Sequence, residues 1–170
     1  REAGYDGSLG TSKPTPTPDP SVLDWETVRD AYAAHHSATP DKFARKMAAD
    51  LLLEENEYAA PTDTEELHQY HEPSGVYDPG AVPMVKETLR LELGAHCSNS
   101  EINEIVESVR QRSYIEREEF NGGEDERLLC VGNGVLDLDT RELRDHSPDY
   151  YFTRALAVSY DADAKAPAIE

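Results

Sequence analysis

The spacing of apolar residues changes along this chain, and that change restricts the fold more than any other feature. Up to about residue 112, apolar residues recur every three or four positions; after residue 128 they recur every second position. The first spacing gives a helix one buried stripe, and the second gives a strand one buried face. We therefore predict an α+β protein in which four amphipathic helices with a small hairpin are followed by a strand-rich C-terminal part.

Four segments carry the helical spacing. The first runs from about Asp24 to His36, and the second opens at Thr39-Pro40, because proline fits the first turn of a helix. The third covers roughly Ala81 to Leu93 and should end at Gly94. The expected apolar positions of these three segments are Trp25, Val28 and Tyr32; Phe43, Ala44, Met47, Ala48, Leu51 and Leu52; and Val82, Val85, Leu89 and Leu93.

A capping signal marks the start of the fourth helix. Ser98 and Glu101 form a capping-box pattern, in which each side chain can bond the backbone amide of the other residue. The apolar face that follows consists of Ile102, Ile105, Val106 and Val109. The fourth helix should therefore begin directly after Ser98.

The remaining segments read as strands and turns. Residues 66–71 and 74–77 predict a small hairpin closed near Pro73. Residues 128–131 and 135–138 predict a second hairpin with its turn at Asn133-Gly134, since both of these residue types tolerate positive φ. A polar turn at 139–142 follows, and we expect the chain beyond Leu143 to be extended.

The composition divides the chain into three parts. Residues 1–22 are rich in proline, threonine and glycine, which is typical of an extended linker. Residues 23–120 form the mainly helical part, and residues 121–170 the strand-rich part. The two cysteines predict no disulfide framework. No apolar run approaches the ~20 residues that would cross a bilayer, so we expect a soluble cytoplasmic protein.

Acidic residues dominate the charge. The chain has 35 Asp and Glu against 16 Lys and Arg, a formal net charge of -19. Periodic apolar residues argue against general disorder, so we predict a folded protein from a high-salt cytoplasm, where ions screen the repulsion. Such a charge repels nucleic acid on average. Any DNA contact in the folded part should therefore use its densest basic group, Arg110, Arg112 and Arg117.

Several short patterns could carry chemistry, and each has a simpler structural reading. Asp137 and Asp139 alternate on a strand and could hold a divalent metal, as in a primase active site. We favour a hairpin in which Asp139 serves the turn and Asp137 faces solvent. The histidines lack metal-ligand spacing. The chain contains no Gly-Lys pair, so it lacks a phosphate-binding loop, and we predict no catalytic residue, metal or cofactor in it.

The third and fourth helices could also form a helix-turn-helix across residues 94–98. The exposed positions of the fourth helix include Asn103, Glu104, Glu107 and Ser108, which suit DNA poorly. Two packed core helices are the alternative that we favour.

A series of motifs resembles a known family. Residues 130–143, 146–153 and 160–164 with Pro167 are similar to the pattern "NGxLDLxTGEL…HxPxxxxT…YDPxAxxP". This pattern belongs to the domain preceding the superfamily 3 helicase in phage and plasmid primases and in poxvirus-type primase-helicases. Upstream segments 63–77 and 103–120 also resemble that family. Arg141 stands where the family has a turn glycine, and Ala162 stands where it has proline.

The resemblance implies a role in DNA replication. The parent would be a hexameric, ATP-driven helicase that uses magnesium, is often fused to a primase, and has its motor after Glu170. This chain would be the non-catalytic collar or adaptor that helps the helicase assemble or load on DNA. Its acidic, lysine-poor composition suggests a haloarchaeal or haloarchaeal-virus version. Two alternatives remain open here: a stand-alone helix-turn-helix-like DNA-binding module, and a primase site at Asp137 and Asp139.

Overall fold

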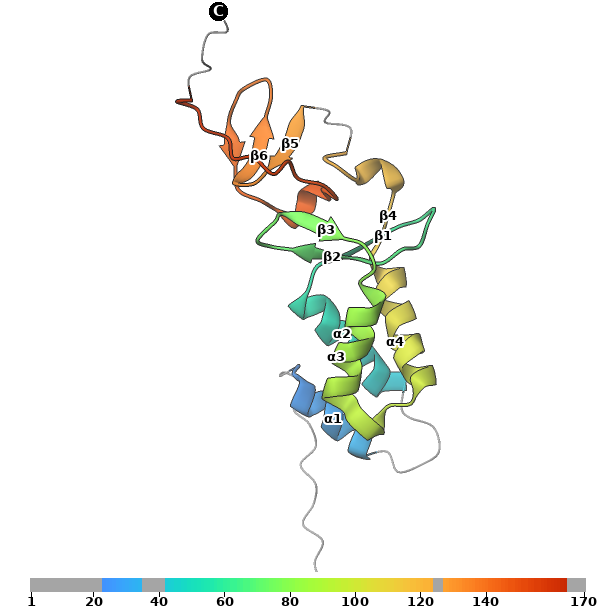
Figure 1. Cartoon of the computed structure of the whole chain (residues 1–170). Helices are drawn as coiled ribbons and strands as arrows, with labels where there is room; N and C mark the ends of the chain where they lie inside the picture. Colours follow the sequence, from blue (N-terminus) through green and yellow to red (C-terminus); the bar gives the residue numbers. More distant parts are fainter. Residues whose placement is uncertain (1–22, 35–41, 124–126, 165–170) are drawn as a thin grey trace, which may run out of the picture.

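A computed structural model describes residues 23–34, 42–123 and 127–164. The predicted linker 1–22, the end of the first predicted helix at His36 and the Thr39-Pro40 helix start all lie outside these described residues. In Figure 1 the helices occupy one end of the molecule, a first sheet lies in the middle, and a second sheet lies at the other end. The α+β class predicted from the spacing is confirmed.

The four predicted helices are present, and they pack into a bundle. They are α1 (Trp25–Ala34), α2 (Lys42–Glu55), α3 (Val82–Leu93) and α4 (Asn99–Arg112). The predicted apolar stripes meet in one core, with Val28, Leu52, Leu89 and Val109 at 1 % exposure or less. Phe43 differs from the expectation: it stands at the first turn of α2, on the rim of the bundle, and is 57 % exposed.

Both predicted helix signals near residue 98 are confirmed. The Ser98 hydroxyl accepts the Glu101 amide, and the Glu101 carboxylate accepts the Ser98 amide at 2.8 Å, so the capping box is complete. Gly94 ends α3 with a φ of +53°, and a short 3-10 turn, η1 (Gly94–His96), leads toward α4. The two helices therefore pack side by side in the bundle.

The first sheet contains four strands in the order β3-β2-β1-β4. The predicted hairpin is present as β2 (His68–His71) and β3 (Val76–Asp78), which pair antiparallel. The sequence did not predict β1 (Tyr58–Pro61) or β4 (Tyr114–Ile115), which pair parallel. All four β1 residues are buried, so the strand shows no alternation.

Two neighbouring helices place the parallel strands. β1 follows α2 directly, and β4 follows α4, so packing of α2 against α4 brings the two strands together. At this junction the Ala60 amide donates to the Ser113 carbonyl at 2.8 Å. The buried Ser113 hydroxyl donates back to the Val109 carbonyl at 2.8 Å. The helical bundle and the first sheet are therefore continuous.

The second sheet contains β5 (Leu128–Val131), β6 (Gly134–Asp137) and β7 (Leu143–Arg144), all antiparallel. Val131 pairs with Gly134, so the two-residue turn is Gly132-Asn133, one position earlier than predicted. Gly134 is needed for another reason. A Cβ atom there would lie 2.3 Å from the Arg144 carbonyl oxygen, so only glycine allows β7 to approach this closely.

The expectation of extended chain beyond Leu143 is wrong at residues 148–151. A 3-10 turn, η3 (Pro148–Tyr150), is followed by Tyr151 with a φ of +47°. These bends turn the aromatic residues toward the first sheet, where the Tyr77 amide donates to the Phe152 carbonyl at 2.7 Å. Tyr150, Tyr151 and Phe152 pack at this junction instead of forming a strand, and a bridge between Leu156 and Val131 follows.

Candidate nucleic-acid interface

The three predicted DNA-contact arginines lie in two different places. Arg110 and Arg112 belong to the last turn of α4, whereas Arg117 opens the 3-10 turn η2 (Arg117–Glu119) beyond β4. Arg110 pairs with Glu107 at 2.8 Å, and Arg112 pairs with Asp50 of α2 at 2.5 Å. The first two arginines are therefore held by carboxylates on the surface of the helical bundle.

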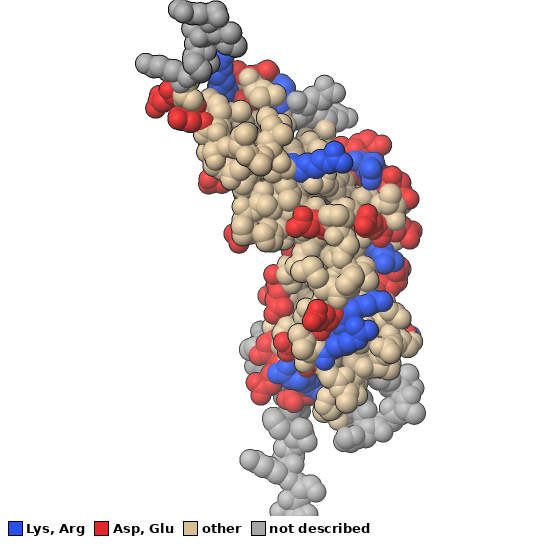
Figure 2. Space-filling model, viewed as in Figure 1, with Lys and Arg blue, Asp and Glu red and all other residues tan. Residues whose placement is uncertain are grey.

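Arg117 is more available than the other two. Its side chain is 59 % exposed, and its ion pair with Asp63 is long, at 3.6 Å, and itself exposed. Such pairs contribute little, because water screens them. On the face shown in Figure 2, basic and acidic side chains are interspersed over both the helical bundle and the upper part of the molecule.

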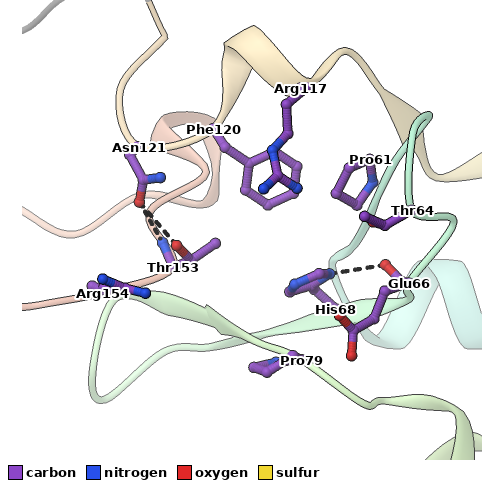
Figure 3. Close-up of a pocket in the computed structure, with 10 residues that line it drawn as sticks. All are labelled: Pro61, Thr64, Glu66, His68, Pro79, Arg117, Phe120, Asn121, Thr153 and Arg154. Carbon is purple, nitrogen blue, oxygen red and sulfur yellow. Dashed lines mark hydrogen bonds between the residues drawn. The ribbon is translucent and has the colours of Figure 1, made fainter.

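A pocket of about 390 Å³ lies beside Arg117, where the first sheet meets the chain that follows the second sheet. Figure 3 shows Arg117 reaching into it from one side, with Arg154 at another border. The ten lining residues are Pro61, Thr64, Glu66, His68, Pro79, Arg117, Phe120, Asn121, Thr153 and Arg154. They come from several loops and strand ends, so the pocket exists only in the folded chain.

Hydrogen bonds fix the walls of the pocket. The Asn121 side-chain oxygen accepts both the amide and the hydroxyl of Thr153, each at 3.0 Å, and so anchors the residue before Arg154. His68 Nδ1 lies 2.9 Å from the Glu66 carbonyl oxygen, an acceptor only, so this nitrogen donates. The His68 ring also packs against Phe120, with centroids 5.5 Å apart. The walls are therefore preformed.

The sequence did not single out the pocket or Arg154. Arg154 is an isolated arginine in an irregular segment, so no local charge cluster marks it. Only the fold brings it to the pocket that Arg117 also lines. Pro61 and Thr153 are so far apart in the sequence that no local motif could have predicted that they line one pocket.

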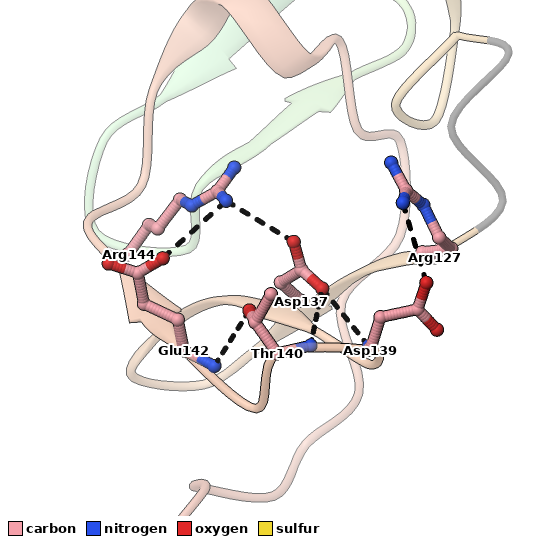
Figure 4. A network of polar contacts seen from close by, with 6 residues as sticks. All are labelled: Arg127, Asp137, Asp139, Thr140, Glu142 and Arg144. Atoms are coloured by element: carbon pink, nitrogen blue, oxygen red, sulfur yellow. Dashed lines mark hydrogen bonds and ion pairs between the residues drawn. The ribbon is translucent and has the colours of Figure 1, made fainter.

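The Asp137 and Asp139 carboxylates bind different partners, and their expected roles are reversed. Asp137 is buried, and its Oδ1 accepts the amides of Asp139 and Thr140 at 3.0 Å each. Its Oδ2 accepts Arg144 at 3.2 Å (Figure 4). Asp139 is exposed and pairs with Arg127 at 3.4 Å. The turn therefore depends on Asp137. Its carboxylate can be buried because backbone amides take the place of water as its hydrogen-bond donors.

The same hydrogen bonds affect the ionisation of Asp137. The bond from the Thr140 amide, followed by that from the Asp139 amide and the charge of Arg144, holds the pKa of Asp137 below its usual range. Across the described ranges, no group of three or more His, Cys, Asp and Glu side chains is arranged to hold a metal ion. Asp137 has its oxygens committed to the turn that ends β6.

The exposed side of α4 does not favour the helix-turn-helix alternative. Glu104 pairs with Arg45 at 3.2 Å, and Glu107 pairs with Arg110, so acidic groups occupy the positions that a recognition helix would present to DNA. The apolar side of α4 is buried in the bundle. This arrangement is that of a core helix.

The chain is therefore an α+β domain with two small sheets. It has a pocket lined by two arginines, and its sequence lacks a phosphate-binding loop. Residues 23–170 match the family profile described as "D5 N terminal like". Because the match spans most of the chain, this protein belongs to that family, the N-terminal domain of D5-like primase-helicases. A comparison with curated proteins found no match. Within the described ranges, every helix is too short or too polar to cross a membrane.

Proposed function

We propose that this chain is a non-catalytic accessory domain, a collar or adaptor, that helps a replicative helicase assemble and load on DNA. The family match over residues 23–170 carries the proposal, because it includes the whole described fold rather than one motif. The domain would act by binding and positioning, since Asp137, the strongest catalytic candidate, is bonded into a turn.

The motor of the proposed assembly lies in the parent protein. By resemblance, we infer a superfamily 3 motor that follows this domain, binds ATP and magnesium, and forms a ring of six subunits. A ring would multiply a weak DNA contact, since several copies act at high effective concentration. This arrangement reconciles an acidic domain with a DNA-processing role.

A deletion within the parent protein tests the proposal. Residues 23–164 would be removed from the parent, and ring formation by mass photometry and unwinding of forked DNA would be compared with those of the intact protein. Basal ATPase activity is the control, because it shows that the motor still folds. We expect ATPase activity to remain while ring assembly on DNA and unwinding fall at least tenfold. Unchanged unwinding by the deletion variant would refute the adaptor role.

A high-salt cytoplasm is the proposed setting. The support is the net charge of -19. The excess acidic side chains repel one another in the folded chain unless ions screen their charges. We expect the melting temperature of the chain to rise steadily as KCl is increased from dilute buffer to above 1 M. A sharp transition at the same temperature across the series would contradict this setting.

A further inference from the structure

The pocket beside η2 combines features that suit one particular ligand chemistry. Two arginines, Arg117 and Arg154, line it against one carboxylate, Glu66, so its lining is net positive in a protein of net charge -19. We propose that this pocket binds one nucleotide unit of single-stranded DNA, with the arginines on its phosphate. The proposal deepens the adaptor function and rests on it.

The arginines are free to engage a phosphate. Arg154 is exposed and makes no ion pair within the described part of the chain. Among the described residues, Arg117 pairs only with Asp63, at 3.6 Å, and a closer phosphate oxygen would replace this carboxylate. Guanidinium groups bind phosphate oxygens in a bidentate manner, which lysine cannot do. These two arginines therefore differ from Arg110 and Arg112, which carboxylates hold at 2.8 and 2.5 Å on the surface of the bundle.

The rest of the lining matches the other parts of a nucleotide. Pro61, Pro79 and Phe120 supply apolar wall for a sugar or base edge, and hydroxyl groups come from Thr64 and Thr153 (Figure 3). The volume of about 390 Å³ lies at the lower end of small-ligand pockets. One nucleotide unit therefore suits the space better than a larger ligand.

A strand fits the pocket better than a free nucleotide. The chain lacks the glycine-rich loop whose backbone amides hold the phosphates of a free nucleotide in P-loop proteins. Two arginines alone would hold one phosphate weakly. Weak binding is useful only when neighbouring nucleotides, or neighbouring copies in a ring, add to it.

The test is an NMR titration of the ¹⁵N-labelled 170-residue chain with the oligonucleotide dT6. We expect the largest shifts at the amides of Asn121, Thr153 and Arg154. The variant Arg117→Ala/Arg154→Ala should bind about tenfold more weakly. Its salt slope should fall by about 0.7 units, the value for the one phosphate that the two arginines no longer neutralise. Unshifted spectra outside the pocket would show that the variant is folded.

A charge-matched variant, Arg90→Ala/Arg141→Ala, controls for general electrostatics, because both residues are exposed and line no part of the pocket. It should retain affinity within about twofold of wild type. Equal losses of affinity in both variants would overturn the assignment, as would the absence of dT6 shifts in wild type. Free dTMP that competes as well as dT6 would replace the strand with a mononucleotide and also refute the proposal. Each of these failures leaves the adaptor function standing, since ring assembly and unwinding test that separately.

Discussion

The backbone amide of Asp139 donates a hydrogen bond of 3.0 Å to Oδ1 of Asp137, whose carboxylate is buried at the end of β6. The same oxygen accepts the Thr140 amide, and Arg144 binds the other oxygen. One carboxylate thus joins a turn to the neighbouring strand β7. The sheet edge depends on this group because removing it would leave two amides and a guanidinium without their acceptor.

We therefore expect Asp137→Ala to lower the melting temperature by roughly 5–10 °C, whereas Asp139→Ala should shift it by no more than ~2 °C. The exposed pair between Asp139 and Arg127 contributes little. Thermal unfolding followed by circular dichroism measures both variants, and Asp137→Asn, which keeps one oxygen acceptor, should fall between them. Equal shifts for the two alanine variants would contradict the assigned roles.

Arg141 occupies a strained backbone position in the same turn. Its φ is +58°, in the left-handed region that costs most residues roughly 1–2 kcal/mol. We expect Arg141→Gly to raise the free energy of unfolding by up to about 1 kcal/mol, since glycine removes this strain. Urea unfolding gives the value. Arg141→Ala is the control: it removes the same charge but retains a Cβ, so a gain as large as that of the glycine variant would show that charge was responsible.

Gly75 and Gly80 both have positive φ, +69° and +77°, but their surroundings differ. A Cβ atom at Gly75 would lie 2.4 Å from the His146 ring, which is held by a 2.9 Å hydrogen bond to the Val131 carbonyl. A Cβ atom at Gly80 would meet nothing within 4 Å.

We expect Gly80→Ala to cost roughly 1 kcal/mol of unfolding free energy, from backbone strain alone. Gly75→Ala should cost at least ~2 kcal/mol more, because the ring that joins the second sheet to the first must move. Chemical denaturation compares the two, and Gly75→Ala/His146→Ala should recover part of the extra loss. Equal costs at the two glycines would show that His146 does not restrict this site.

Local patterns predicted the helices and the hairpins but not how they assemble. The stripe through Ile102, Ile105 and Val109 recurs within one helix, so it is visible in the sequence alone. By contrast, β1 is four buried residues and β4 is two residues, and each is a strand only because α2 and α4 place it beside the other. Pairing between distant segments leaves no local signal.

The candidate site shows the same limit. Alternation placed Asp137 and Asp139 on one face of a strand, but it could not show which carboxylate the turn amides would reach. Clustering identified Arg117 as a possible DNA contact because it follows other arginines. It could not identify Arg154, which lines the same pocket as Arg117 only because the chain returns from the second sheet.

Buried tyrosine makes the fold sensitive to alkaline pH. Burial in β1, together with the nearby Glu55 carboxylate, raises the pKa of Tyr58 to about 12. The unfolded state loses this proton near pH 10, whereas the folded state keeps it. The free energy of unfolding should therefore fall as pH rises from about 10 to about 12, with Tyr58 accounting for about 2 kcal/mol.

Tyr58→Phe removes the titrating hydroxyl and keeps the ring, so its stability should decline less steeply over that range. Guanidinium unfolding at pH 9 to 12 measures the slope. Tyr160→Phe, a change outside the three hydrophobic cores, should keep the wild-type slope. An unchanged slope in Tyr58→Phe would show that other groups carry the alkaline transition.

Arg112 is held by a shorter ion pair than Arg117. Asp50 of α2 accepts Arg112 at 2.5 Å and Lys46 at 2.6 Å, so it joins α4 to α2. Burial alone would raise the pKa of Asp50, but the hydrogen bonds from Lys46 and Arg112 outweigh it and lower the pKa. We expect Arg112→Ala to cost about 1 kcal/mol of stability at neutral pH, and Arg117→Ala to cost almost nothing.

DNA binding should show the opposite order. In the parent oligomer, the triple variant Arg110→Ala/Arg112→Ala/Arg117→Ala should weaken DNA binding, with the salt slope falling by about one unit for each phosphate that is no longer bound. Arg117→Ala alone should account for most of that decrease, since Arg110 and Arg112 are already paired with carboxylates. A salt series from about 50 to 200 mM separates these contributions. If the triple variant keeps the wild-type affinity and slope, the three arginines serve only to balance the end of α4 and its acidic neighbours.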